Sequence, residues 1–177
     1  GQWRATGIIE QEQLESGARR MTRRSTAAGA VENVRTALRG YGLDVDAYDV
    51  HIDFPGGMPV DGPSAGVAMA VAVYSAITGK PVDGCAALTG EIGIGGEVLP
   101  VGGVPAKIEA ALRAGATTVL IPRENYERAF ARESAVHAID RLEEALHWLL
   151  DAPALAPEES VAAFPAQPAG VLTARQA

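Results

Sequence analysis

The stretch PVDGPSAGVAMAVAVYSAIT, residues 59–78, begins as a proline- and glycine-rich turn and continues as an apolar segment. The apolar part covers residues 65–77 and is followed by Gly79 and Pro81, residue types that end helices. It is long enough for a buried helix and shorter than the roughly 20 residues that cross a bilayer. The stretch therefore predicts a tight turn that leads directly into a buried helix.

Helices and strands alternate on both sides of this segment. Upstream, hydrophobic periodicity predicts a strand at 3–10, a polar loop at 10–24, a helix at 26–39 and a strand at 48–54. Downstream, it predicts strands at 86–92 and 97–101 joined as a hairpin, then a helix at 104–114, a strand at 117–121, a helix at 124–132, a strand at 135–139 and a helix at 141–150. We expect one mixed α/β (α+β) domain over 1–150, with a strand and polar loop at 1–25, and a flexible Ala/Pro-rich tail over 151–177.

Composition narrows the class of protein. The chain has 177 residues, of which 47% are hydrophobic, enough to bury the core of a single domain. The net charge of −7 argues against nucleic-acid binding, which needs a surplus of Lys and Arg on one face. The single cysteine, Cys85, cannot form an internal disulfide, and the N-terminus lacks a signal-peptide layout. A cytoplasmic location is expected, and membrane anchoring of a longer parent protein stays open.

Ser64 lies between the rigid turn and the apolar helix, and two interpretations are open. As a helix N-cap, its hydroxyl would satisfy a free amide of the first turn. As a nucleophile, it would have those amides and the positive end of the helix dipole beside it, where they stabilise an oxyanion. The small neighbours Gly62, Ala65 and Gly66 would then allow a substrate backbone to approach closely.

A serine nucleophile needs a base, and lysine is a stronger candidate than histidine. His51, His137 and His147 show neither metal-ligand spacing nor a triad motif, so we interpret them as structural. Only two of the fifteen basic residues are lysines, Lys80 and Lys107, and arginine cannot serve as a base because it stays protonated.

The helix predicted at 104–114 places Lys107 on the same face as Val104, Ile108 and Ala111, which should point inward. The residues three and four positions away are not acidic, so burial should lower the pKa of Lys107. The alternative is a lysine that extends its amine to the surface. Thr89 is either an ordinary strand threonine or a hydroxyl that orients the lysine amine.

Three motifs, DGPSAG at 61–66, TGEI at 89–92 and GGEVLPVGGVPAK at 95–107, resemble the Lon protease family in order and spacing. The resemblance extends from about residue 6 to residue 122. It implies a Ser-Lys dyad with Ser64 as nucleophile and Lys107 as base, and Thr89 in support of the lysine. It also implies that Asp61 shapes the loop of the nucleophile, with Gly62 and Pro63 as further supporting residues. The implied fold resembles the second domain of ribosomal protein S5.

The resemblance further implies a hexameric ring that cleaves unfolded polypeptides in protein quality control. The GPSAG pattern at 62–66 is similar to the bacterial type, whereas Pro105 and Ala106 stand where the family commonly has Lys-Glu. No G-x-x-x-x-G-K-[ST] motif is present, so we expect ATP and Mg²⁺ to bind an upstream ATPase module of the parent protein, and this chain to need no cofactor or metal. Two alternatives stay open: a non-catalytic Lon-like assembly module, and a small-molecule kinase of related fold whose loop at 59–66 would cradle phosphate.

Overall fold

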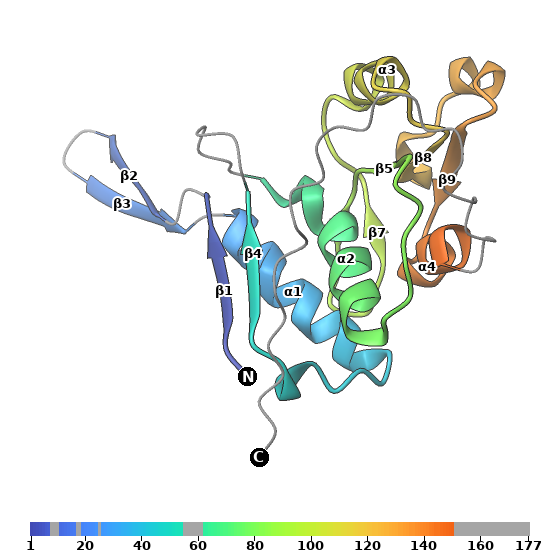
Figure 1. Ribbon diagram of the computed structural model, residues 1–177. Helices are drawn as coiled ribbons and strands as arrows, with labels where there is room; N and C mark the ends of the chain where they lie inside the picture. The colour runs from blue at the N-terminus through green and yellow to red at the C-terminus, as the bar shows by residue number, and fades with distance from the viewer. Residues whose placement is uncertain (8–10, 17–18, 25, 55–61, 151–177) are drawn as a thin grey trace.

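The computed structural model describes residues 1–7, 11–16, 19–24, 26–54 and 62–150 (Figure 1). At its N-terminal end, strand β1 (Trp3–Thr6) pairs in parallel with β4 (Val50–Asp53). Between these two strands come the antiparallel pair β2 (Gln11–Ser16) and β3 (Arg19–Arg24), and helix α1 (Thr26–Gly40). The hairpin of β2 and β3 projects away from the rest of the molecule in Figure 1.

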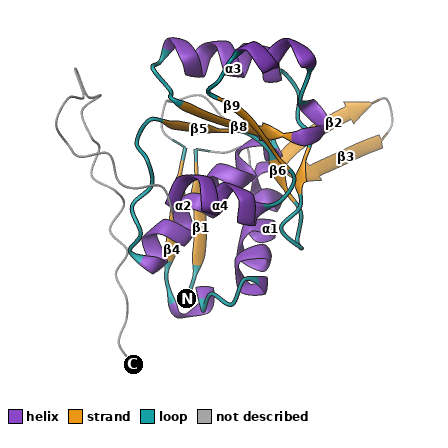
Figure 2. Ribbon diagram, turned by 90° about the vertical axis from the view of Figure 1, so that its right-hand side faces the viewer, coloured by secondary structure: helices purple, strands orange, loops and turns teal. Residues whose placement is uncertain are grey.

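A three-stranded parallel sheet organises the second half, in the order β5 (Ala86–Leu88), β8 (Thr118–Pro122), β9 (Val136–Ile139). Helix α3 (Val104–Arg113) covers one face, whereas α2 (Gly66–Thr78) and α4 (Leu142–Leu150) lie on the other (Figure 2). A short antiparallel hairpin, β6 (Glu91–Ile92) and β7 (Val98–Leu99), connects β5 to α3.

Alternate side chains of β8 belong to two separate hydrophobic clusters. Leu120 packs into the larger cluster with α1, α2 and α4, and Val119 and Ile121 pack into the smaller cluster under α3. This division follows from strand geometry, because successive side chains point to opposite faces of a sheet. The strand thus contacts both layers of the molecule.

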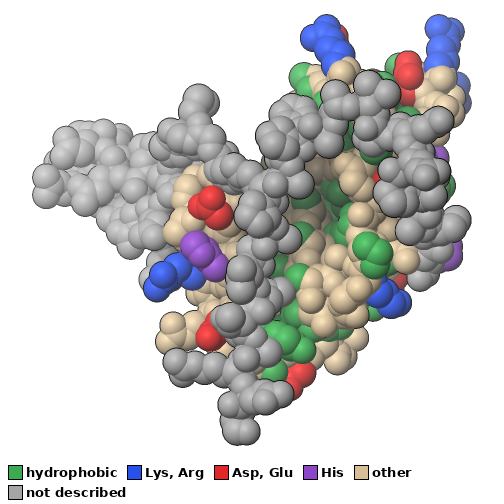
Figure 3. Space-filling view, viewed as in Figure 1, with side chains coloured by type: hydrophobic (Ala, Val, Ile, Leu, Met, Phe, Trp, Pro, Cys, Tyr) green, Lys and Arg blue, Asp and Glu red, His purple; other side chains and the backbone are tan. Residues whose placement is uncertain are grey.

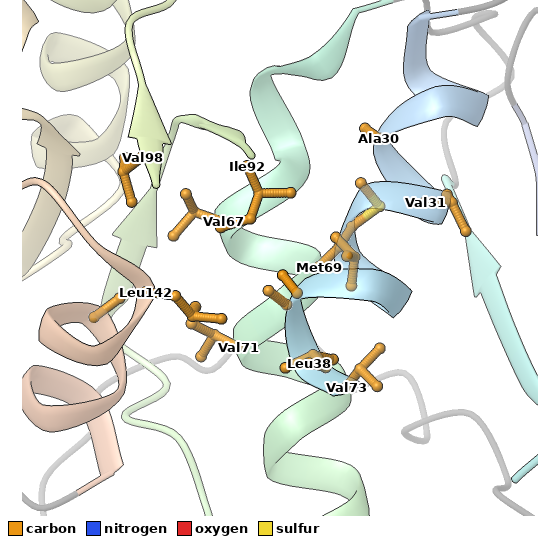
Figure 4. Packing of buried hydrophobic residues seen from close by; sticks show 14 of the residues in the cluster. Ala30, Val31, Leu38, Val67, Met69, Val71, Val73, Ile92, Val98 and Leu142 are labelled. Atoms are coloured by element: carbon orange, nitrogen blue, oxygen red, sulfur yellow. The ribbon is translucent and has the colours of Figure 1, made fainter. Parts of the chain in front are cut away.

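The larger cluster forms mainly where α1 and α2 cross (Figure 4). In α1, helical spacing brings Val31, Val34 and Leu38 to one buried face, with small alanines between them. In α2, residues around much of the circumference are buried, because α1 packs on one side and α4 on the other. This packing fixes the position at which α2 begins.

The mixed α/β class predicted from the sequence is confirmed. The helices predicted at 26–39, 65–77, 104–114 and 141–150 and the strands predicted at 48–54, 117–121 and 135–139 are confirmed to within a few residues. The strand predicted at 3–10 is confirmed for Trp3–Thr6. The likeness to the second domain of ribosomal protein S5 stays a prediction, as do the domain boundaries.

The polar loop predicted at 10–24 is wrong, because this segment forms the hairpin of β2 and β3. A two-stranded ribbon is held by hydrogen bonds between backbones, which polar residues form as readily as apolar ones. Hydrophobic periodicity therefore gives no sign of it.

Two further predictions are wrong. Residues 86–92 form two strands of different sheets, because the backbone of Gly90 bonds to Ser64 and Val67 instead of to a neighbouring strand. The hairpin predicted across the turn at 93–96 is confirmed as the pair of β6 and β7. Residues 124–132 form parts of two 3₁₀ helices in place of one α-helix. Asn125 and Phe130 both face the region beneath α3. In an α-helix, side chains five residues apart point about 140° away from each other, so a single α-helix would not direct both to this region.

Figure 3 shows hydrophobic side chains in the hollowed middle of one face, with charged side chains around them and the visible Lys and Arg apart from one another. None of the helices within the described residues has the length and apolar character needed to cross a membrane. Asp61 and the predicted tail at 151–177 lie outside the described residues.

Candidate active site

Ser64 lies in a 3₁₀ helix, Pro63–Ala65, that leads into α2. Gly62 precedes it with φ = +147°, a conformation that side-chain-bearing residues rarely adopt. The N-cap of α2 is Ala65, and the Ser64 hydroxyl makes no hydrogen bond with any described residue. The N-cap interpretation of Ser64 is therefore wrong, and the hydroxyl of this half-buried residue is not used to cap the helix.

Lys107 lies on α3 with its side chain directed inward. Its neighbours Val104 and Ile108 are 2% and 4% exposed, as the predicted helix face requires. The Lys107 amine donates a hydrogen bond to Thr89 Oγ1 at 3.1 Å and forms no ion pair with a described carboxylate. Burial lowers the pKa of Lys107 below its ordinary value. The predicted direction is confirmed, and the interpretation as a lysine that extends to the surface is wrong.

Thr89 joins the lysine to the segment that carries Ser64. Its residue is 8% exposed, and Oγ1 accepts from Lys107 while donating to Ser64 O at 3.3 Å. The backbone reinforces this contact, since Gly90 N–H donates to the same carbonyl at 2.9 Å. The Thr89 N–H donates to Leu120 O of β8 at 3.1 Å. Three segments distant in sequence thus meet around one hydroxyl.

Gly66 serves the packing of the chain itself. A Cβ atom at this position would lie 2.8 Å from the backbone N of Ile92, closer than such atoms approach. The sequence interpretation assigned this small residue to the approach of a substrate. The structure shows instead that it allows α2 to pack directly against β6.

Two asparagines near the site were missed from the sequence. Asn33 of α1 donates to Ile92 O at 3.1 Å, and Asn125 bonds to both backbone polar groups of Val101. Each bond spans more than 20 residues of sequence, so local patterns do not reveal it. The only indication in the sequence is that the chain has just two asparagines, each beside apolar residues.

The histidines have other partners. His51 Nε2 lies 3.1 Å from Thr6 Oγ1, and His137 stacks on Trp148 with 4.0 Å between ring centroids. Within the described residues, none of the histidines hydrogen-bonds to Ser64, and no three His, Cys, Asp or Glu side chains gather as metal ligands would. Lysine is therefore the basic side chain that the structure connects to the serine segment.

Comparison with known proteins identifies the family. Residues 15–150 match the Lon protease (S16) C-terminal proteolytic domain. The chain belongs to the Lon protease family. The bacterial subtype stays a prediction, because both bacterial and archaeal Lon proteases match.

Three relatives illustrate the similarity. Lon protease 2 of Bacillus subtilis (strain 168) is 48% identical over 134 residues, which cover 76% of this chain and 24% of the relative. Lon protease of Haemophilus influenzae is 40% identical over 134 residues, covering 70% of this chain and 17% of the relative. Archaeal Lon protease of Archaeoglobus fulgidus is 50% identical over 103 residues, covering 57% and 17%. The chain thus spans about a quarter or less of the length of these Lon proteases.

Proposed function

We propose that this Lon-family domain is a serine endopeptidase that uses Ser64 as nucleophile and Lys107 as general base. The observation that carries the proposal is the hydrogen-bonded connection from the Lys107 amine through Thr89 to the Ser64 carbonyl. An inward lysine without a carboxylate partner among the described residues is suited to lose its proton, because burial lowers its pKa. A neutral amine is the form that accepts a proton from a hydroxyl.

In the proposed reaction, neutral Lys107 removes the proton from Ser64 Oγ as the oxygen attacks a peptide carbonyl. The resulting oxyanion is held by backbone amides near Ser64. The N–H groups of Gly66 and Val67 are not among them, since they already donate to Pro63 O and Gly90 O. The C–N bond then breaks, and protonated Lys107 gives its proton to the departing amine.

Deacylation repeats this sequence with water. Lys107, neutral again, takes a proton from a water molecule that attacks the ester of Ser64. Collapse of the second tetrahedral intermediate releases the carboxylate product, and the proton returns to Ser64 Oγ. Thr89 acts throughout as the acceptor that holds the amine in position, in both its neutral and its protonated form.

The biological setting is also a proposal. The substrates would be unfolded polypeptides, cleaved in the cytoplasm by a hexameric ring in which an upstream module of the same protein binds ATP and Mg²⁺. This domain would need no cofactor and no nucleic acid. The relatives are named Lon proteases and are much longer than this chain, which supports proteolysis by a longer protein that contains this domain.

The test is covalent labelling with a peptidyl boronate or a sulfonyl fluoride, read by mass spectrometry in the full-length protein. Ser64→Ala and Lys107→Ala should both lose the label, and Lys80→Ala, which changes the exposed lysine, should retain it. Labelling that persists in Ser64→Ala would exclude this nucleophile. A wild type that never labels and cleaves no peptide would favour an assembly module without catalysis.

A further inference from the structure

The side chain of Asn125 holds the segment that leads into α3. Asn125 Oδ1 accepts from Val101 N–H at 2.8 Å, and Asn125 Nδ2 donates to Val101 O at 3.0 Å. One amide thus satisfies both backbone polar groups of one residue, as a neighbouring strand would. Only this orientation of the amide pairs each donor with an acceptor.

This contact connects α3 to the strand that also holds Thr89. Asn125 lies three residues after the end of β8, and β8 accepts the Thr89 N–H through Leu120 O. The hydroxyl and the helix that carries the lysine are therefore both tied to β8. The amine reaches that hydroxyl at 3.1 Å, a distance that depends on both ties.

The other contacts of the α3 N-terminus have little directional character. Val104 and Ile108 pack into the smaller cluster, and apolar contacts of this kind tolerate small sliding movements. Gly103, the N-cap, makes no side-chain hydrogen bond to the helix. Among the described residues, the paired bonds from Asn125 to Val101 are thus the directional link to the segment that leads into the helix, six residues before Lys107.

We propose that Asn125 is a positioning residue for Lys107. Its amide fixes where α3 begins, and thereby aligns the lysine amine with Thr89 and with the serine segment. The expected effect on kcat rests on the proposed function. The expected effect on the environment of the Lys107 amine does not, because it can be measured without catalysis.

The experiment compares Asn125→Leu, which removes both bonds without adding charge, with Asn125→Asp, which keeps the acceptor and loses the donor. Glu124→Ala, an exposed neighbour in the same 3₁₀ helix, is the matched control. In the full-length protein, both Asn125 variants should lower kcat for a short peptide by about 10- to 100-fold with little change in KM, since small misplacement of a catalytic group costs this much. The control should keep the wild-type kcat.

The second readout is competitive acetylation of Lys107 as a function of pH, measured by mass spectrometry and normalised to Lys80. Loss of the Asn125 clamp should change both the burial of the amine, which lowers its pKa, and its bond to Thr89, so the pH dependence of Lys107 acetylation should differ from that of the wild type. The charged residues next to these elements in sequence, Glu91 two residues after Thr89 and the ion pair of Glu109 and Arg113 on α3, are the same in all variants. A merely destabilised protein would lose activity without this shift.

The possible outcomes separate the two proposals. A lysine reactivity that changes in both Asn125 variants supports the positioning role, even if Ser64→Ala proves fully active and the proposed function fails. Wild-type kcat and unchanged lysine reactivity in folded Asn125→Leu would overturn the positioning role. A shift confined to Asn125→Asp would overturn it too, because added charge alone explains that result. If Asn125→Leu does not fold, the small neutral variant Asn125→Ser replaces it under the same criteria.

Discussion

Replacing Thr89 with valine removes the hydroxyl at the centre of the site and keeps the branched shape of the side chain. The lost contacts are the 3.1 Å bond from the Lys107 amine and the 3.3 Å bond to Ser64 O. A bond to a charged group contributes roughly 1.5–3 kcal/mol and a neutral bond about 0.5–1.5 kcal/mol. Ser64 O keeps the Gly90 N–H, so the unfolding free energy should fall by roughly 1–3 kcal/mol, near the value for the amine bond alone.

The effect on catalysis should be similar in free energy to the effect on stability, since each tenfold change in rate corresponds to about 1.4 kcal/mol. General base catalysis contributes about 10²–10⁴-fold, and Thr89→Val leaves the amine of Lys107 present but unaligned, so we expect kcat to fall by about 10². Because Thr89 Oγ1 accepts from the charged amine, its loss should lower the pKa of Lys107 further. The acid limb of the pH-rate profile should then move to lower pH.

The assay is cleavage of a fluorogenic peptide from pH 5 to 10, alongside a urea titration to measure the unfolding free energy. Thr89→Ser keeps the hydroxyl and should retain most of the wild-type kcat. A Thr89→Val variant with wild-type kcat, or with an acid limb at higher pH, would refute the role given to this hydroxyl.

Three further predictions follow from individual contacts. Gly66→Ala should lower the unfolding free energy, measured in urea, by about 1–3 kcal/mol, because its methyl group would press on the backbone of Ile92. An unchanged midpoint of urea unfolding would contradict this packing. Burial lowers the pKa of His137 below 6.5, so the stability it contributes is present above pH 6.5 and is lost as the pH falls from 6.5 through the lowered pKa of the folded state. With the other tryptophan changed to phenylalanine, Trp148 fluorescence should titrate with a midpoint below 6.5, and a midpoint above it would be incompatible with the stack. Burial also lowers the pKa of Lys107, so between that lowered value and 10.5 the unfolded chain binds more protons than the folded protein. The unfolding free energy should therefore rise with pH in this window, and Lys107→Met should lose that rise. An identical pH dependence in both proteins would argue against a desolvated amine.

The placement of Lys107 was predictable because two local signals agree. Helical spacing puts it on the face of Val104 and Ile108, and the scarcity of lysine in the chain marks the position as one that arginine cannot fill. The first signal depends only on neighbouring residues, and the second only on the composition of the chain. The contact with Thr89 was implied by the family resemblance, whereas spacing along the chain left it open, because the contact depends on how β5, β8 and α3 assemble.

Apart from the pair of β2 and β3, the features of the fold that the sequence did not predict depend on contacts between distant segments. The break between β5 and β6 exists because Gly90 bonds to the segment before α2. The change from α-helix to 3₁₀ helix after β8 follows from contacts of Asn125 and Phe130 with a different part of the chain. Apolar spacing describes burial on one element and contains no information on such polar partners. Asp61, predicted to shape the serine loop, stays a prediction.

The division of the interior into two clusters has a consequence for inactivation by heat. The larger cluster contains nineteen buried residues and includes the helix that follows Ser64, whereas the smaller one contains six and anchors the helix of Lys107. Detaching the smaller layer exposes far less apolar surface than melting the whole domain, so it needs less free energy. Warming should therefore separate the amine from the serine segment by local opening while most of the circular dichroism signal persists. On this view the temperature at which turnover stops lies below the global Tm, and cooling restores activity without refolding.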